Sequence, residues 1–328
     1  MHPIPLIRKI CGKRLPERVI IRVDAGAVAG LSFGHLSRCL VLAKALKKTY
    51  HSDVCLVMAD YPEGIAHALQ SKLPVLKLPQ NASLDEKEKI WLQKTADFRP
   101  DWTFIDLPYP FSFSTICRAL KRLGSKILFI DDTRFANPGA EVFLNSSILA
   151  CANTCQKASA KYLLGPEYFI FDYIKKKVPK NLLPGEKKIL ISFGGSDPSG
   201  LSHSVADALN TLPLPPTTNI SLVMGPGFKK KHASVALHLK RTPGIHLIDS
   251  PQSIYPYFQN ADLVFCAGGR TLYELNELNI QAFPIASIDH EKPIVEAFIR
   301  QGIITAGMAV WDKTKFIKKT TLLMKKLS

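Results

Sequence analysis

Short apolar runs alternate with amphipathic stretches along most of the chain. In the first half, the runs 19–23, 53–58, 101–107 and 126–132 are apolar over most of their length, which is typical of strands buried on both faces. Between them lie stretches with helical spacing, of which the clearest carries Leu36, Leu40, Ala43 and Leu46 on one side. This alternation predicts an α/β fold with a parallel sheet covered by helices.

The alternation stops once and then begins again. Residues 173–188 are basic and contain two prolines and a glycine, after which 187–209 again read as strand, glycine loop and helix. A chain of 328 residues is long for one domain. We therefore predict two Rossmann-like α/β domains, 18–175 and 188–328, a linker at 176–187, and a loose basic extension at 1–17 that lacks the apolar core of a signal peptide.

Candidate chemistry lies where strands meet glycine-rich loops. Asp24 ends the first strand, Gly26, Gly30 and Gly34 follow, and His35 opens the helix. Such a loop lets backbone N–H groups hold a phosphate, and a histidine there is a candidate general base. The spacing matches neither the dinucleotide fingerprint nor the P-loop. A plain turn, with His35 only packing or capping the helix, explains the pattern equally well.

The second domain carries two further loops of this kind. Their residues are Gly194, Gly195 and Ser196 in one, and Gly268, Gly269, Arg270 and Thr271 in the other. In the first, Ser196 or Asp197 can simply cap the next helix. In the second, the N–H groups and the threonine hydroxyl suit a diphosphate. Glu274, one turn later, suits the two hydroxyls of a ribose, unless it is a solvent-facing helix residue.

Further polar residues are candidates for a sugar. Asp24 and Asp106 both end strands, where carboxylates suit sugar hydroxyls but are also common turn residues. His290 and Glu291 precede a late helix and either reach the sugar or are ordinary first-turn residues. Because ligands of open α/β sheets bind at the carboxyl ends of the strands, two such sheets facing across a cleft would hold one ligand between them.

Charge and cysteines narrow the class of partner. The net charge of +16 predicts an acidic partner. Nucleic acid is the poorer choice, because the sequence has no basic stripe interleaved with aromatic residues. Seven scattered cysteines fit a reducing cytoplasm better than disulfides or a metal site. No apolar run is long enough to span a membrane, although the basic clusters are compatible with a weak contact to a membrane surface. Nothing in the sequence implies a cofactor or an obligate protein partner.

Four segments together resemble one known family. Residues 22–46, RVDAGAVAGLSFGHLSRCLVLAKAL, resemble the opening of the nucleotide-sugar hydrolases of pseudaminic acid biosynthesis, which act on UDP-2,4-diacetamido-2,4,6-trideoxy-β-L-altropyranose. Spore-coat polysaccharide glycosyltransferase-like proteins share this opening. The segments 161–171, 189–200 and 266–275 follow in the family's order. The resemblance implies a GT-B fold, with UDP bound mainly by the C-terminal half and the sugar in the cleft.

The resemblance also implies roles for individual residues. His35 takes the place of the catalytic histidine, which activates water to displace UDP with inversion and without a metal. The diphosphate-loop positions fall on Gly195, Ser196, Gly269 and Thr271. Glu274 falls on the ribose position, and Asp24 on a substrate-side position.

Two segments depart from the family pattern. Asp106, Leu107 and Pro108 stand where the hydrolases often carry Asp-His-Tyr, and His290–Glu291 replaces an Asn-Gln pair. Both changes fall on the sugar side. Three hypotheses therefore remain: a UDP-sugar hydrolase, an inverting glycosyltransferase for a surface polysaccharide, and a non-catalytic nucleotide-sugar binder.

Overall fold

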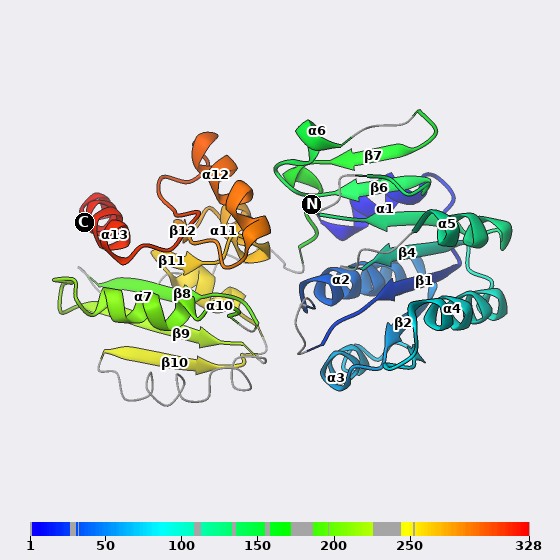
Figure 1. The fold of residues 1–328 in the computed structure, drawn as a ribbon, viewed down its shortest axis with the longest axis horizontal. Helices are drawn as coiled ribbons and strands as arrows, with labels where there is room; N and C mark the ends of the chain where they lie inside the picture. The colour runs from blue at the N-terminus through cyan, green and yellow to red at the C-terminus, as the bar shows by residue number, and fades with distance from the viewer. Residues whose placement is uncertain are drawn as a thin grey trace. The chain divides into compact units, whose positions relative to one another are not determined.

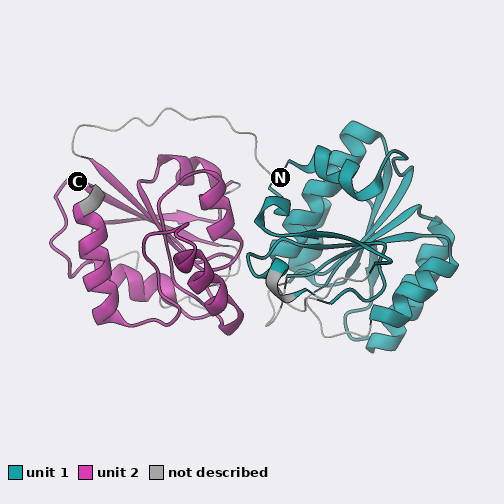
Figure 2. Cartoon of the chain, turned by 90° about the horizontal axis from the view of Figure 1, so that it is seen from above, with its two compact units in different colours: residues 1–172 teal, residues 173–328 magenta. Residues whose placement is uncertain are grey.

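The chain consists of two compact units, Met1–Asp172 and Tyr173–Ser328 (Figure 2). The computed structural model describes residues 2–26, 31, 33–107, 113–132, 136–154, 158–171, 186–195, 197–225, 244–251 and 253–327. The linker predicted at 176–187 lies almost entirely outside these ranges and stays a prediction. Its last residue, Lys187, begins the first strand of the second unit.

The first unit contains a seven-stranded sheet in the order β3-β2-β1-β4-β5-β6-β7 (Figure 1), and every pairing is parallel. This confirms the parallel sheet that the apolar runs predict. The strands are β1 (Arg18–Val23), β2 (Asp53–Ala59), β3 (Val75–Leu78), β4 (Trp102–Asp106), β5 (Lys126–Ile130), β6 (Val142–Asn145) and β7 (Lys161–Leu164).

Helices cover both faces of this sheet. Apolar residues of α1, α2 and α3 share one buried cluster with alternate strand residues, and those of α4 and α5 share another with the residues between. Leu36, Leu40, Ala43 and Leu46 are all buried, as their spacing predicts. The helices are α1 (Pro3–Cys11), α2 (Phe33–Tyr50), α3 (Pro62–Leu69), α4 (Leu84–Phe98), α5 (Phe113–Arg122) and α6 (Ala150–Asn153), with a 3₁₀ turn η1 (Pro166–Tyr168).

The N-terminal segment is part of the first unit, so the prediction of a loose extension is wrong. Helix α1 packs against α2, and its residues Leu6 and Ile7 are fully buried. The hydroxyl of Tyr50, at the end of α2, donates to the carbonyl of Ile4 at 2.8 Å. The basic residues of the segment obscure this helix in the sequence, but its apolar side chains fall on one face and are removed from water.

The second unit contains a five-stranded parallel sheet in the order β10-β9-β8-β11-β12. Helices α7 and α13 contribute to the apolar cluster on one face. The strands are β8 (Lys187–Ser192), β9 (Thr218–Met224), β10 (Ile245–Asp249), β11 (Leu263–Cys266) and β12 (Ala282–Pro284). The helices are α7 (Leu201–Leu209), α10 (Tyr255–Asn260), α11 (Arg270–Glu277), α12 (Lys292–Arg300) and α13 (Lys313–Leu327), with a 3₁₀ turn η2 (Asp289–Glu291).

Each sheet has a point at which its strand order reverses. In the first unit, β2 and β3 are added on one side of β1, and β4 to β7 on its other side, so the order reverses between β1 and β4 (Figure 1). In the second unit, the order reverses between β8 and β11. Ligands of open α/β sheets bind beside the carboxyl ends of such a pair. These four ends carry Asp24, Asp106 and the two glycine loops of the second unit.

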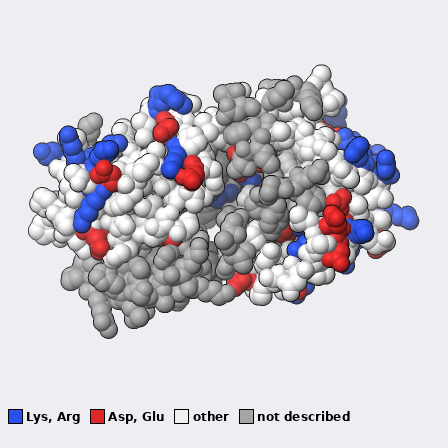
Figure 3. All heavy atoms as spheres, viewed as in Figure 1, with Lys and Arg blue, Asp and Glu red and all other residues white. Residues whose placement is uncertain are grey.

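Surface charge is finely mixed on the face drawn in Figure 3, where Lys and Arg side chains form small groups, several of them beside Asp or Glu. Among the described residues, no helix has both the length and the apolar character needed to cross a bilayer.

Candidate functional site

His35 lies in the first turn of α2, as the sequence predicts, and its side chain is 23% exposed. Its Nδ1 atom is 2.7 Å from Oδ1 of Asp106, the last residue of β4. The first turn of a helix and the end of a strand 71 residues later thus meet beside the reversal point of the first sheet.

Asp106 is completely buried and accepts two further hydrogen bonds, from Arg38 Nε at 2.5 Å and Arg38 Nη2 at 2.7 Å. Burial alone would raise its pKa, but the charges of Arg38 and His35 outweigh burial and hold the pKa of Asp106 well below its ordinary value. An ionised carboxylate can only accept hydrogen bonds. The proton of a neutral His35 therefore resides on Nδ1, which leaves Nε2 as a proton acceptor.

Arg38 is a further member of this cluster that our reasoning from the sequence did not single out. Although burial opposes its charge, the carboxylates of Asp106 and Asp132 raise the pKa of Arg38 well above its ordinary value. Arg38 Nη1 also donates to Asp132, just beyond β5. The available signal was the spacing of His35 and Arg38, because residues three apart share one face of a helix. Asp106, predicted as a sugar ligand, instead holds His35 and Arg38.

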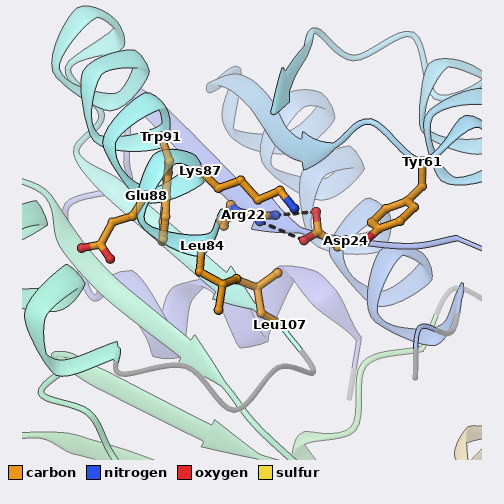
Figure 4. Close-up of a pocket in the computed structure, with 8 residues that line it drawn as sticks. All are labelled: Arg22, Asp24, Tyr61, Leu84, Lys87, Glu88, Trp91 and Leu107. Carbon is orange, nitrogen blue, oxygen red and sulfur yellow. Dashed lines mark hydrogen bonds and ion pairs between the residues drawn. The ribbon is translucent and has the colours of Figure 1, made fainter. Parts of the chain in front are cut away.

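Asp24 is engaged in a buried ion pair. Its two carboxylate oxygens accept from Arg22 Nη1 and Nη2 at 2.5 and 2.8 Å, and the backbone N–H of Ala59 donates to Oδ1 at 2.6 Å. Residues two apart on a strand face the same side, which places Arg22 and Asp24 together. Both line a pocket at the carboxyl end of β1 (Figure 4).

In the second unit, the loop after β8 turns at Gly194, whose φ of +78° favours glycine. Gly195 lies so close to Gly225 that a Cβ on Gly225 would be 2.4 Å from the Cα of Gly195. Ser196 lies outside the described residues. The carboxylate of Asp197 accepts from the N–H groups of Leu201 and Ser202, both at 2.9 Å, and so satisfies the start of α7. The helix begins later than predicted, because its N-cap is Gly200 and Pro198 lies before it.

The loop after β11 is held by Glu291, a residue predicted to contact a sugar. Oε2 of Glu291 accepts from the N–H of Gly268 at 3.2 Å and from the N–H of Ser287 at 2.8 Å. Burial raises the pKa of Glu291, although these N–H groups act in the opposite direction. A Cβ on Gly269 would approach Oε1 of Glu291 to 2.8 Å. Glu291 therefore braces the loop, whereas the neighbouring His290 is exposed.

Glu274 is buried, so the solvent-facing alternative is wrong. Its Oε1 accepts from the hydroxyl of Tyr255 at 3.0 Å and from Arg270 Nε at 2.8 Å. Burial and the charge of Glu274 raise the pKa of Tyr255. Arg270 and Thr271 form the first turn of α11, directly after Gly268 and Gly269. These residues lie together as predicted, with Arg270 oriented toward Glu274.

No protein-family model matches the chain. It is similar to the uncharacterized protein MJ1062 of Methanocaldococcus jannaschii, with 22% identity over 297 residues, covering 87% of this chain and 58% of the relative. It is also similar to the spore coat polysaccharide biosynthesis protein SpsG of Bacillus subtilis, with 27% identity over 162 residues, covering 46% of this chain and 45% of SpsG. The chain thus spans about half the length of these curated relatives.

Solved structures match nearly the whole chain. MurG of Acinetobacter baumannii gives a TM-score of 0.65 at 14% identity, over 94% of this chain and 92% of MurG. The spinosyn rhamnosyltransferase SpnG gives 0.63 at 13% identity, over 93% and 91%. The chain has the GT-B fold. This confirms the predicted fold class at the level of two parallel α/β domains. The cleft predicted between the domains of the GT-B fold stays a prediction.

Proposed function

We propose that the chain is a nucleotide-sugar hydrolase that releases UDP from a UDP-linked amino sugar of the pseudaminic acid type. The observation that carries this proposal is the contact of His35 with the buried, ionised Asp106 beside the reversal point of a GT-B sheet. Nε2 of His35 is the atom left to accept a proton.

In the proposed reaction, His35 Nε2 removes a proton from water as the water oxygen bonds to the anomeric carbon. The bond from that carbon to the diphosphate oxygen breaks, and its electron pair leaves with UDP. Attack opposite the leaving group inverts the anomeric centre. Asp106 stabilises the imidazolium that forms, and a positioned base of this kind contributes about 10²–10⁴-fold to the rate.

The second unit supplies the proposed UDP site. The N-terminus of α11, with Gly269 and Thr271, would hold the diphosphate, together with Gly194, Gly195 and Ser196. The buried Glu274 would accept the ribose hydroxyls. UDP is supported by the motif resemblance. The structural match to a Neisseria meningitidis UDP-GlcNAc 2-epimerase bound to UDP-GlcNAc agrees with this choice, with a TM-score of 0.59 at 15% identity over 94% of this chain and 91% of the epimerase.

A glycosyltransferase is the second candidate, because an acceptor hydroxyl needs the same base as water. The similarity to a spore coat polysaccharide biosynthesis protein favours this alternative. A non-catalytic binder is the third, and the retained dyad of His35 and Asp106 argues against it.

The test is UDP release from a panel of UDP-sugars, including trideoxy diacetamido sugars, without an acceptor. We expect release with free sugar as co-product by the wild type and release slowed about 10²–10⁴-fold by His35→Ala, while both proteins bind UDP equally. UDP binding without release would overturn hydrolysis, and an acceptor screen would then separate a transferase from a binder. Unchanged release by His35→Ala would show that His35 is not the base.

A further inference from the structure

The first unit has a pocket that neither His35 nor Asp106 lines. It lies at the carboxyl end of β1, has an empty volume of about 670 Å³ that is partly open to solvent, and is called here the Trp91 pocket. Its lining residues are Arg22, Asp24, Tyr61, Leu84, Lys87, Glu88, Trp91 and Leu107 (Figure 4). We propose that the Trp91 pocket binds the N-acyl group of the amino sugar, an inference that rests on the proposed function.

The pocket and the proposed base lie at the same edge of the sheet, on its two faces. In the parallel pairing of β1 with β4, Val23 is opposite Asp106. Asp24 and Leu107, each one residue further on, both line the pocket. Successive side chains leave a strand on opposite faces, so Asp106 meets His35 on the α2 side while Leu107 joins the apolar cluster on the α4 side. A sugar above this edge can therefore meet both.

The charges of the pocket residues balance. Arg22 is paired with Asp24 inside the pocket, and Lys87 and Glu88 add one charge of each sign from α4. Figure 4 shows Lys87 extending toward Arg22 and Asp24, whereas Glu88 points away from them. The buried charges of the pocket, those of Arg22 and Asp24, cancel each other and so give little compensation for burying a phosphate or a carboxylate. An uncharged group is the better ligand.

The hydrogen-bonding groups of the pocket favour an acceptor. Arg22 Nε and Trp91 Nε1 are buried and have no acceptor among the described residues. The carboxylate of Asp24 already receives three hydrogen bonds. The ammonium group of Lys87 has three donors, and one of them reaches the carbonyl of Gln80 at 2.7 Å. A ligand that brings an acceptor oxygen, directly or through a water molecule, would satisfy a donor of Lys87, and the two unpartnered donors make the surrounding wall of the pocket rich in N–H groups.

The rest of the lining is apolar or aromatic. Leu107 and Trp91 are buried, Leu84 is 51% exposed at the rim, and the guanidinium of Arg22 lies 5.7 Å from the centre of the Trp91 ring. These surfaces suit a small apolar body, and the donors suit one neutral oxygen. An N-acyl group combines both, since it has a carbonyl oxygen and a methyl group, whereas a plain hydroxyl at the same position offers an acceptor oxygen but no apolar body.

The experiment is ligand-observed saturation-transfer NMR on the whole chain, with UDP-N-acetylglucosamine and free N-acetylglucosamine as probes. In the wild type, we expect the acetyl methyl protons to receive the strongest saturation of all the sugar protons, in both probes. Lys87→Met removes donors but keeps the apolar stem, and we expect it to weaken binding of free N-acetylglucosamine about tenfold, as the loss of one charged hydrogen bond implies. The dissociation constant of UDP should stay unchanged.

Lys89→Met is the matched control, because Lys89 is exposed on the same helix and does not line the pocket. Leu84→Trp, at the half-exposed rim, is a second variant that should exclude the acetyl group without loss of folding. Acetyl saturation that is absent, or that is equal in the wild type and both pocket variants, would overturn the proposal. Acetyl saturation without any uridine saturation would keep the pocket assignment and refute the UDP part of the proposed function.

Discussion

Replacing Asp106 by Asn keeps the size of the side chain but removes the charge that fixes the tautomer of His35. Asp106 accepts one hydrogen bond from His35 and two from Arg38, at 2.5–2.7 Å. If His35 is the base, the loss of its orientation should slow UDP release about 10²–10⁴-fold. That factor corresponds to about 3–5 kcal/mol in the barrier.

The same substitution also perturbs folding. It leaves Arg38, which is buried, with Asp132 as its remaining carboxylate partner. Breaking a buried pair costs about 3–5 kcal/mol. Domains are stable by about 5–15 kcal/mol, so the variant should fold with a lowered urea midpoint. Urea unfolding therefore has to accompany every activity measurement, so that lost activity is not confused with lost protein.

A double-mutant cycle separates a positioning role from a structural one. UDP release is measured for the wild type, His35→Ala, Asp106→Asn and the double variant. If Asp106 acts through His35, the double variant should be slower than His35→Ala by no more than about twofold. Fully additive losses, or an Asp106→Asn protein that retains wild-type turnover, would refute the mechanism. ¹⁵N NMR of His35 gives an independent readout, because the wild type should carry its proton on Nδ1.

Three further predictions concern stability and are measured by urea unfolding. Leu6→Ala should lower the free energy of unfolding by about 2–5 kcal/mol, because Leu6 is fully buried. Lys13→Ala, at an exposed site, is the control and should change it by less than about 0.5 kcal/mol. A Leu6→Ala protein of unchanged stability would contradict the packing of α1. Gly64→Ala should cost about 1–3 kcal/mol, since a Cβ there would lie 1.9 Å from the carbonyl oxygen of Ala25. Burial raises the pKa of Glu291 above its ordinary value of 4.5, so the stability of the wild type should fall relative to Glu291→Gln as the pH rises above 4.5. Parallel stability curves for the two proteins would exclude this role.

Local patterns were enough to predict the sheets. Continuous apolar runs identify β1, β2, β4 and β5 as strands with both faces buried, and helical spacing identifies the buried face of α2. Such patterns arise because a helix on a sheet buries one face and a central strand buries two. This holds whether the neighbouring elements are near or far along the chain. The α1 helix was missed because the segment 1–17 as a whole is basic, although α1 itself has only two basic residues, Arg8 and Lys9, and its apolar residues follow the same rule.

The partners within the site depend on contacts between distant residues. Asp106 lies 68 residues from Arg38 along the chain, and Asp132 lies 94 residues from it. The sequence shows a carboxylate at the end of β1, of β4 and of β5. It does not show which carboxylate receives the histidine, because that depends on strand order and on the side chain's face of the sheet. The same holds for Glu291, whose contact with Gly268 follows from the adjacency of β11 and β12.

Asp106 and Glu291 are both buried carboxylates, but different groups surround them, and this difference bears on their roles. Asp106 has a guanidinium and an imidazole as neighbours, so its charge is compensated and persists down to acidic pH. Glu291 has mainly backbone N–H groups around its carboxylate, and these do not offset burial. An ionised Glu291 would repel a diphosphate held by the same loop, whereas a protonated one would not. Asp106 is therefore suited to keep a base oriented at every pH near neutrality. The carboxylate of Glu291 therefore takes up a proton at a higher pH than that of Asp106 does.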